Sequence, residues 1–348
     1  MTVAPSEWGR RLSDRIRAAL DAGDMASARR LALEGDGQAR SLEKEYVLMY
    51  RGLGITIRVL LRLLGERPAR AGLTPLLRRF RGDMIALMEA AYASPESRRV
   101  VGTLRNGVAT GPAENASAER DRTARLLEVA EERFVAEQAR LARAALAALE
   151  AADVSRARAL VDDKERGQYV PLHDRMIRLM ADVFGHILRE FGPAELLRFH
   201  LETAEGQRPG FEKWERMSAA DFAQASAFLL KQHMGQVEVR EDEEKFTIAQ
   251  APCGSGGRLR LGGAYSGADA LPFVEEPGPL TLGQERFPVY CSHCPVWNGV
   301  APVAWFGRPH WVFDAPARAD GSCTLHVFKR REGAPADYLA RLSPPRRG

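Results

Sequence analysis

Cysteine, lysine and long hydrophobic runs are all scarce in this sequence. It contains four cysteines in 348 residues, and only six of its 50 basic residues are lysines. No N-terminal hydrophobic stretch follows a basic one, and the most hydrophobic run, 53–64, carries Arg58 and Arg62. We therefore expect neither a signal peptide nor a membrane-spanning helix. Four cysteines without an export signal favour free thiols or metal ligands in a cytoplasmic protein over disulfides.

The charge balance is close to even. The 50 basic and 46 acidic residues leave a net charge of +4, and the shortage of lysine indicates a coding bias toward arginine more than a nucleic-acid-binding patch. At 45% hydrophobic and 28% charged residues the chain is too apolar for intrinsic disorder, and it is long enough for two domains. We expect a protein that binds neither nucleic acid nor membrane.

The composition changes near residue 235. Before this point, long stretches place apolar residues three or four apart, which is typical of amphipathic helices. After it come all four cysteines and twelve of the twenty prolines. The sequence therefore predicts an α+β protein, with a helical N-terminal domain at 1–235 and a small, Cys-rich antiparallel β domain with a metal site at 236–348. The predicted helices are 12–22, 42–64, 126–149, 172–190 and 219–232.

Short runs rich in β-branched and aromatic residues predict the strands of the C-terminal domain. A hairpin connection is expected at 306–309, and a long loop at 94–120 between two halves of the helical domain. The predicted strands are 237–239, 246–248, 259–261, 287–290, 300–306, 311–313 and 324–328.

The helical domain shows an internal repeat. The segment 18–24 recurs as 147–153, which is 129 residues later, and both copies are followed by an Ala-Arg pair and a leucine. Asp24 and Asp153 stand at the same place in the two copies, where each is a natural N-cap for the next helix. We predict a duplication of 8–93 and 121–206, against the alternative of a chance match between alanine-rich helices.

The four cysteines are the clearest candidates for chemistry. Cys291 and Cys294 form a C-x-x-C pair, the spacing at which two thiolates grip one tetrahedral ion. Cys253 opens a Gly-rich turn, and Cys323 follows an Asp-Gly-Ser turn. This set predicts a zinc site made by four cysteines, either closed or with an open position. Two alternatives remain, an iron–sulfur cluster on the same ligands and four buried cysteines without metal.

Several histidines and one carboxylate are candidates for acid–base catalysis. His293 lies inside the C-x-x-C pair, where it would act as a ligand or carry a proton. His173, Asp174 and His186 lie on the helix predicted at 172–190, and His233 closes the last predicted helix. They are expected to face a pocket between the two domains. The alternative is that these side chains form a solvated helix face and have no catalytic role.

The segment 321–328, Gly-Ser-Cys-Thr-Leu-His-Val-Phe, resembles the late Gly-x-x-Cys turn and strand of two related kinds of small-molecule domain. One is the L-2-amino-thiazoline-4-carboxylic acid hydrolase-like group, and the other is the 4-vinyl reductase type of sensor domain. The likeness covers about 100 residues. It implies a small-molecule ligand, and by analogy with the vinyl reductase type it implies metal binding by Cys253, Cys291 and Cys294.

Together these features predict a cytoplasmic zinc-binding protein, a metal-dependent and hydrolase-like enzyme acting on a small sulfur- or nitrogen-containing metabolite. One alternative is a non-enzymatic module in which a four-cysteine zinc is structural and the protein binds a ligand or partner. Another is an iron–sulfur redox protein. The sequence carries no indication of oligomeric state.

Overall fold

The structure is a computed structural model that describes residues 4–68, 72–109, 115–316, 320–330 and 332–343. The chain divides into two compact units. The helical unit is Arg10–Leu179, and the sheet unit combines Met1–Gly9 with Met180–Gly348. Among the described residues, no helix has both the length and the apolar character needed to span a bilayer.

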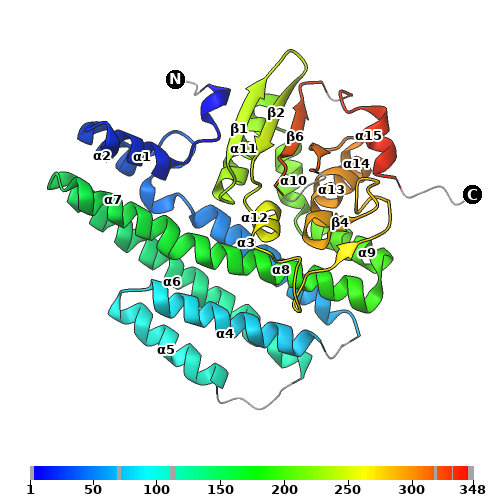
Figure 1. The fold of residues 1–348 in the computed structure, drawn as a ribbon, viewed down its shortest axis with the longest axis horizontal. Helices are drawn as coiled ribbons and strands as arrows, with labels where there is room; N and C mark the ends of the chain where they lie inside the picture. Colours follow the sequence, from blue (N-terminus) through cyan, green and yellow to red (C-terminus); the bar gives the residue numbers. More distant parts are fainter. Residues whose placement is uncertain (1–3, 69–71, 110–114, 317–319, 331, 344–348) are drawn as a thin grey trace, which may run out of the picture. The chain divides into compact units, whose positions relative to one another are not determined.

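The helical unit consists of helices and their connections (Figure 1). The predictions at 12–22, 42–64 and 126–149 are confirmed, although the second begins with a short 3-10 turn. The last helix of the unit, α8, continues into the sheet unit and confirms the prediction at 172–190. The elements are α1 (Leu12–Asp21), α2 (Met25–Glu34), η2 (Leu42–Lys44), α3 (Val47–Gly65), α4 (Leu73–Ala91), α5 (Pro95–Ala109), α6 (Ala116–Glu150), α7 (Val154–Asp162), the π-helix η3 (Asp163–Tyr169) and α8 (Val170–Phe191).

The loop predicted at 94–120 is wrong, because α5 occupies most of it. Ser94 and Pro95, which resemble a turn in the sequence, begin this helix. The Ser94 hydroxyl accepts a hydrogen bond from the backbone N–H of Ser97 at 3.2 Å, and proline is well suited to a first helical position. Residues 110–114, within the same predicted loop, lie outside the described residues.

The two copies of the repeated turn have the same local structure. Asp24 caps α2 by accepting a hydrogen bond from the N–H of Ser27, and Asp153 caps α7 in the same way from Arg156, both at 2.9 Å. The residue before each aspartate has a positive φ, +72° at Gly23 and +55° at Ala152. Both predicted N-caps are confirmed.

The repeated turns also form matching ion pairs. Asp21 pairs with Arg158, and Glu150 pairs with Arg29. Asp21 and Glu150 are 129 residues apart, as are Arg29 and Arg158, so each pair is the counterpart of the other. In each pair, the acidic residue of one copy binds the arginine of the other copy. Two copies related by a local two-fold axis produce this reciprocal pairing. It supports the repeat at these turns, while the duplication over 8–93 and 121–206 stays a prediction.

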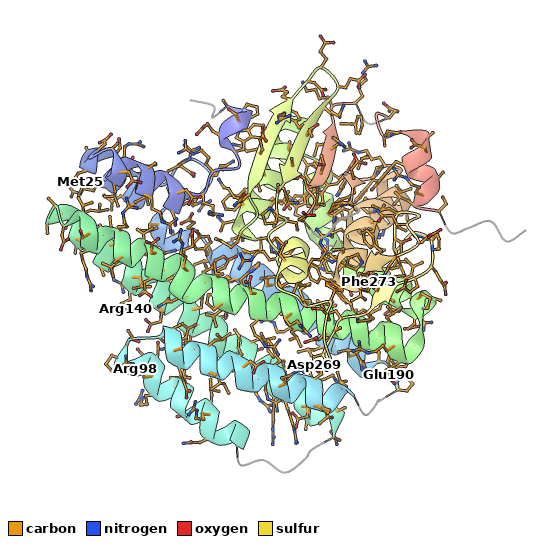
Figure 2. The ribbon with its side chains drawn as sticks, viewed as in Figure 1. Met25, Arg98, Arg140, Glu190, Asp269 and Phe273 are labelled. Atoms are coloured by element: carbon orange, nitrogen blue, oxygen red, sulfur yellow. The ribbon has the colours of Figure 1, made fainter. Side chains whose placement is uncertain are left out.

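The sheet unit contains a four-stranded antiparallel sheet of order β1-β2-β6-β5 and a two-stranded ribbon of β3 and β4. One face of the large sheet carries Val239, Ile248 and Leu325, which belong to a buried core with Phe222 and Ala227 of α11. Side chains are densely packed around the strands and helices of this unit (Figure 2). The strands are β1 (Val237–Glu241), β2 (Lys245–Gln250), β3 (Phe273–Val274), β4 (Phe287–Pro288), β5 (Val312–Asp314) and β6 (Cys323–Phe328).

Helices make up much of the rest of the sheet unit. The helix predicted at 219–232 is confirmed as α11, and the predicted segment 236–348 falls within this unit together with α9, α10 and α11. The helical elements are η1 (Pro5–Glu7), α9 (Pro193–Glu205), α10 (Arg208–Glu215), α11 (Ala219–Gln232), α12 (Gly256–Leu261), η4 (Val289–Ser292), α13 (His293–Pro295), the π-helix η5 (Val296–Val300), α14 (Ala301–Phe306) and α15 (Ala336–Arg341).

Four of the predicted strands are confirmed, and two are wrong. The strands at 237–239, 246–248, 311–313 and 324–328 are β1, β2, β5 and β6, while 259–261 and 300–306 are helical. The segment predicted at 287–290 is a strand only for its first two residues. Gly307 adopts a left-handed φ of +75° and ends α14, so the hairpin predicted at 306–309 is a helix C-cap. The two wrongly predicted segments are short, so residue preferences alone do not decide between strand and helix.

The fold confirms the α+β prediction at the level of architecture. It is mostly helical and carries a small antiparallel sheet near the C-terminus.

A four-cysteine cavity as the candidate functional site

All four cysteines line one small cavity of the sheet unit. Its volume is about 40 Å3, and hydrophobic side chains including Leu282, Phe287 and Phe313 make up much of its wall. The cysteines are free thiols and only partly exposed. Residues 38 and 29 positions apart in sequence therefore line the same cavity. The four are Cys253, Cys291, Cys294 and Cys323.

Strand pairing and two short helices position these side chains. Cys323 is the first residue of β6 and pairs with Gln250 at the end of β2, which places the turn that carries Cys253 beside it. Cys291 lies in η4 and Cys294 in α13, directly after β4. The sheet thus supplies two of the thiols, and the helical turn after β4 supplies the other two.

The Gly-rich turn after Cys253 allows the backbone to come close to the sulfurs. A Cβ atom placed on Gly256 would lie 2.7 Å from the Sγ of Cys291, which is closer than real Cβ atoms approach. A Cβ on Gly257 would lie 3.2 Å from the Cβ of Cys253. Because these glycines lack a Cβ, the backbone is able to pack closely against two of the four cysteines.

Burial and one cation set the electrostatics of the cavity. Burial raises the pKa of Cys291 to about 12 and raises the pKa values of Cys294 and Cys323 well above their usual range. The Arg260 guanidinium, which also lines the cavity, opposes all three shifts. Its Nε is buried and has no hydrogen-bond partner among the described residues. The cavity therefore presents a positive charge to anything that binds as an anion.

His293 is the one predicted catalytic residue that lies directly beside a cysteine. Its Nδ1 donates a hydrogen bond to the carbonyl of Tyr290, and its Nε2 lies 3.5 Å from the Sγ of Cys294. Burial lowers the pKa of His293 to about 4, so the ring is neutral at pH 7. With the proton on Nδ1, Nε2 presents a lone pair to the sulfur.

None of the other predicted catalytic residues lines the cysteine cavity, although the His233 carbonyl packs against Gly254, next to Cys253. His173 and Asp174 belong to the helical unit, where Nδ1 of the ring and Oδ1 of the carboxylate are 2.9 Å apart. His186 and His233 belong to the sheet unit and are not lining residues of the cysteine cavity. His186 is buried on α8, so it does not lie on a solvated face, and it contacts the ring of Phe191. Roles for these four residues stay predictions.

Sequence reasoning missed two members of the site, Arg260 and Tyr290. The Tyr290 side chain is buried in the cavity wall and hydrogen bonds to Ser255, whose hydroxyl lies 3.7 Å from the Sγ of Cys253. Tyr290 directly precedes Cys291, and this adjacency was a usable signal. Arg260 had no such signal in the sequence, because only the helical course of α12 brings its side chain back to the cysteines.

The arrangement of the thiols bears on the kind of metal centre they could hold. Within the described parts of the chain, no group of three or more His, Cys, Asp or Glu side chains is arranged to hold a metal ion. The four cysteines share a cavity without being gathered about a single point. Comparison with family models, curated proteins and solved structures finds no match for the chain.

Proposed function

We propose that the protein binds an iron–sulfur cluster through Cys253, Cys291, Cys294 and Cys323 and acts as a redox protein. The observation that carries the proposal is the convergence of all four thiols on one largely apolar cavity. Four thiolates are the usual ligand set of both two-iron and four-iron clusters. When bound, such a cluster supplies one-electron transfer.

Among the described residues no tight ligand group is found, and this bears on the choice between a single ion and a cluster. A tetrahedral zinc with Zn–S bonds of about 2.3 Å requires sulfurs about 3.8 Å apart, all gathered on one centre. The cysteines here surround a space of about 40 Å3, and no three of the groups that commonly bind metals are arranged about one point among the described residues. In a cluster, the iron and sulfide ions occupy the space between the cysteines. Different irons bind different cysteines, so the four cysteine sulfurs need not gather about one ion.

The remaining lining residues suit an anionic redox centre. Leu282, Phe287 and Phe313 exclude water from the thiolates, and Arg260 offsets part of their negative charge. No aspartate or glutamate is among the lining residues. Low polarity together with one cation is a means by which proteins set the potential of a cluster.

Anaerobic purification tests the proposal. We expect a coloured protein with iron and acid-labile sulfide in matching amounts, and each Cys→Ser substitution should reduce both. The variant Ser266→Ala, in an exposed turn outside the cavity, is the control and should keep the full cluster content. Protein that stays colourless and iron-free after anaerobic reconstitution with iron and sulfide would refute the proposal.

A zinc-dependent hydrolase is a second candidate, favoured by the position of His293. The Nε2 lone pair of the neutral His293 faces the Sγ of Cys294, so the ring is able to accept the proton that this thiol would lose on binding zinc. Zinc held by these cysteines would polarise a water molecule or a substrate carbonyl. Stoichiometric zinc without iron, lost in the Cys→Ser variants, would support this candidate in place of the cluster.

A further inference from the structure

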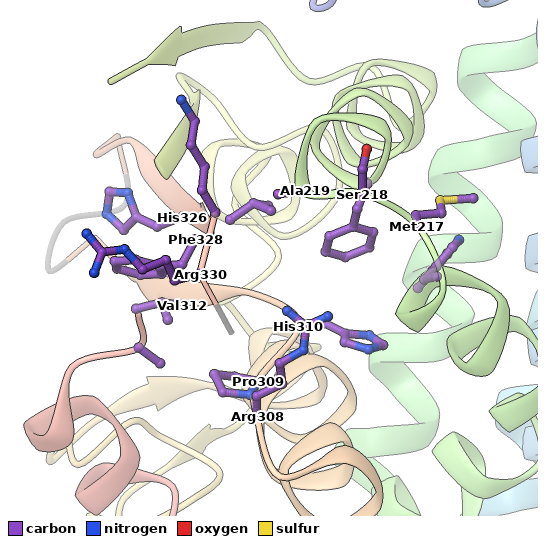
Figure 3. Close-up of a pocket in the computed structure, with 15 residues that line it drawn as sticks. Met217, Ser218, Ala219, Arg308, Pro309, His310, Val312, His326, Phe328 and Arg330 are labelled. Atoms are coloured by element: carbon purple, nitrogen blue, oxygen red, sulfur yellow. The ribbon is translucent and has the colours of Figure 1, made fainter. Parts of the chain in front are cut away.

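A second cavity of about 210 Å3 lies in the sheet unit and shares no lining residue with the cysteine cavity. Its wall comes from α10, the start of α11, the segment after α14, and β5 and β6. Figure 3 shows Arg308 and His310 on one side of it and His326, Phe328 and Arg330 on another. A volume below the roughly 300–1,000 Å3 of drug-sized pockets limits the ligand to a small metabolite.

Aromatic rings form much of the wall. Trp214 and Phe222 line it from the helices and lie 6.0 Å apart between ring centroids, and Phe328 lines it from β6. Flat aromatic surfaces of this kind favour a flat ligand, because stacking adds to the free energy of apolar burial.

His310 contributes a neutral imidazole ring to the wall. Its Nε2 lies 3.3 Å from Oε2 of Glu215, so the carboxylate accepts the Nε2 proton. Burial lowers the pKa of His310 to about 4 even though Glu215 opposes the shift, so the ring is neutral. Nδ1 therefore carries a lone pair, and it is buried with no partner among the described residues. A buried unpaired acceptor is costly, and because Nδ1 is buried it does not open onto the cavity, so His310 offers a ligand its ring and not this lone pair.

The charged groups at the cavity are cations. Arg330 is exposed and forms no ion pair with any described residue, whereas Glu215 binds Arg308 and Glu241 binds Lys329. His326 bonds to Thr247 and Asp314. The lining residues include no aspartate or glutamate. Arg330 is thus the cation that remains available to a ligand.

We propose that this cavity binds a small, flat carboxylate. Arg330 holds the carboxylate, and the aromatic wall, including the ring of His310, packs on the flat body. This site is independent of the cysteine cavity and does not rest on the presence of a cluster.

The test uses 4-hydroxybenzoate as the probe, with binding followed by isothermal titration calorimetry on the full chain. We expect saturable binding, comparable binding of benzoate, which lacks the hydroxyl, and about tenfold weaker binding of the uncharged 4-hydroxybenzamide. The variant Arg330→Gln should weaken 4-hydroxybenzoate about tenfold and leave 4-hydroxybenzamide unchanged. The matched control Arg240→Gln removes an exposed arginine of β1, outside this cavity, and should not affect either ligand.

Two results would overturn the proposal. One is the absence of saturable binding of 4-hydroxybenzoate at millimolar concentration. The other is binding that Arg330→Gln weakens no more than Arg240→Gln does. Because Arg330 is a surface residue, the variant is expected to fold, and an unchanged thermal unfolding profile would verify this.

Discussion

Gly256 packs against the sulfur of Cys291, so that a Cβ at position 256 would lie 2.7 Å from Sγ. Gly256 belongs to the turn that follows Cys253, whereas Cys291 belongs to the helical turn after β4. The two cysteine-bearing segments therefore meet at a contact that tolerates no side chain. The glycine is required by the geometry of the cavity.

The variant Gly256→Ala should lose bound metal, because the added methyl group displaces Cys291 from the cavity. We expect iron or zinc content to fall to less than half of the wild-type value, as measured by elemental analysis. The control is Gly82→Ala in the middle of α4, where nothing lies within 4 Å of the added Cβ. That substitution should keep the metal and raise stability by about 0.5–1 kcal/mol. Full metal content in Gly256→Ala would show that the site adapts to a side chain here.

Arg260 should set the reduction potential of a bound cluster. Its positive charge favours the more negative, reduced state, so Arg260→Gln should lower the midpoint potential, by an amount on the order of tens of millivolts. Arg260→Lys should keep most of the effect. Arg258→Gln is the matched control, because Arg258 lies on the same short helix but is not a lining residue of the cavity. A redox titration followed by visible absorbance gives the potentials, and equal values for Arg260→Gln and wild type would exclude this role.

The sequence predicted the cysteine site better than it predicted the surroundings of the site. Cysteine is rare in this chain and sits at turns, so its four positions stood out without knowledge of the fold. Arg260 is one of many arginines, and its role depends on the three-dimensional course of α12. Sequence periodicity could not reveal it.

The errors in secondary structure have one physical origin. Residues 300–306 contain valine, tryptophan and phenylalanine, which favour strands on average, but the chain enters this segment from a continuous helical run that begins at η4. The long helices were predictable because their apolar stripes repeat over many turns. Short segments offer no such repetition, and tertiary packing decides their structure.

The matching ion pairs of the helical unit should have similar and small energies. Asp21–Arg158 and Glu150–Arg29 join exposed or half-exposed side chains, so solvent screens both. Double-mutant cycles with alanine should give coupling energies below about 1 kcal/mol for each pair, equal within error. Urea unfolding measures these values. A large coupling in one pair alone would contradict a symmetric arrangement of the two turns.

The neutral state of His310 should make stability depend on pH. The pKa of His310 is about 4 in the folded protein, against the ordinary value of 6.5 that it regains on unfolding. Between these pH values the unfolded chain binds a proton that the folded chain does not, so the free energy of unfolding falls as the pH falls from 6.5 toward 4. The contribution of His310 is fully present above pH 6.5, and its loss at pH 4 amounts to about 1–3 kcal/mol.

The variant His310→Gln isolates this contribution from that of other buried histidines. It should show a shallower decrease in the free energy of unfolding between pH 6.5 and 4 than the wild type, as measured by urea unfolding at several pH values. The informative quantity is the slope of the free energy of unfolding against pH, compared between wild type and variant. The glutamine also changes packing, but this shifts the free energy of unfolding by the same amount at every pH. The variant His326→Gln is the control, since its imidazole is half-exposed and bonded to the exposed Asp314. Parallel curves for wild type and His310→Gln would mean that His310 has the same pKa in the folded and unfolded protein.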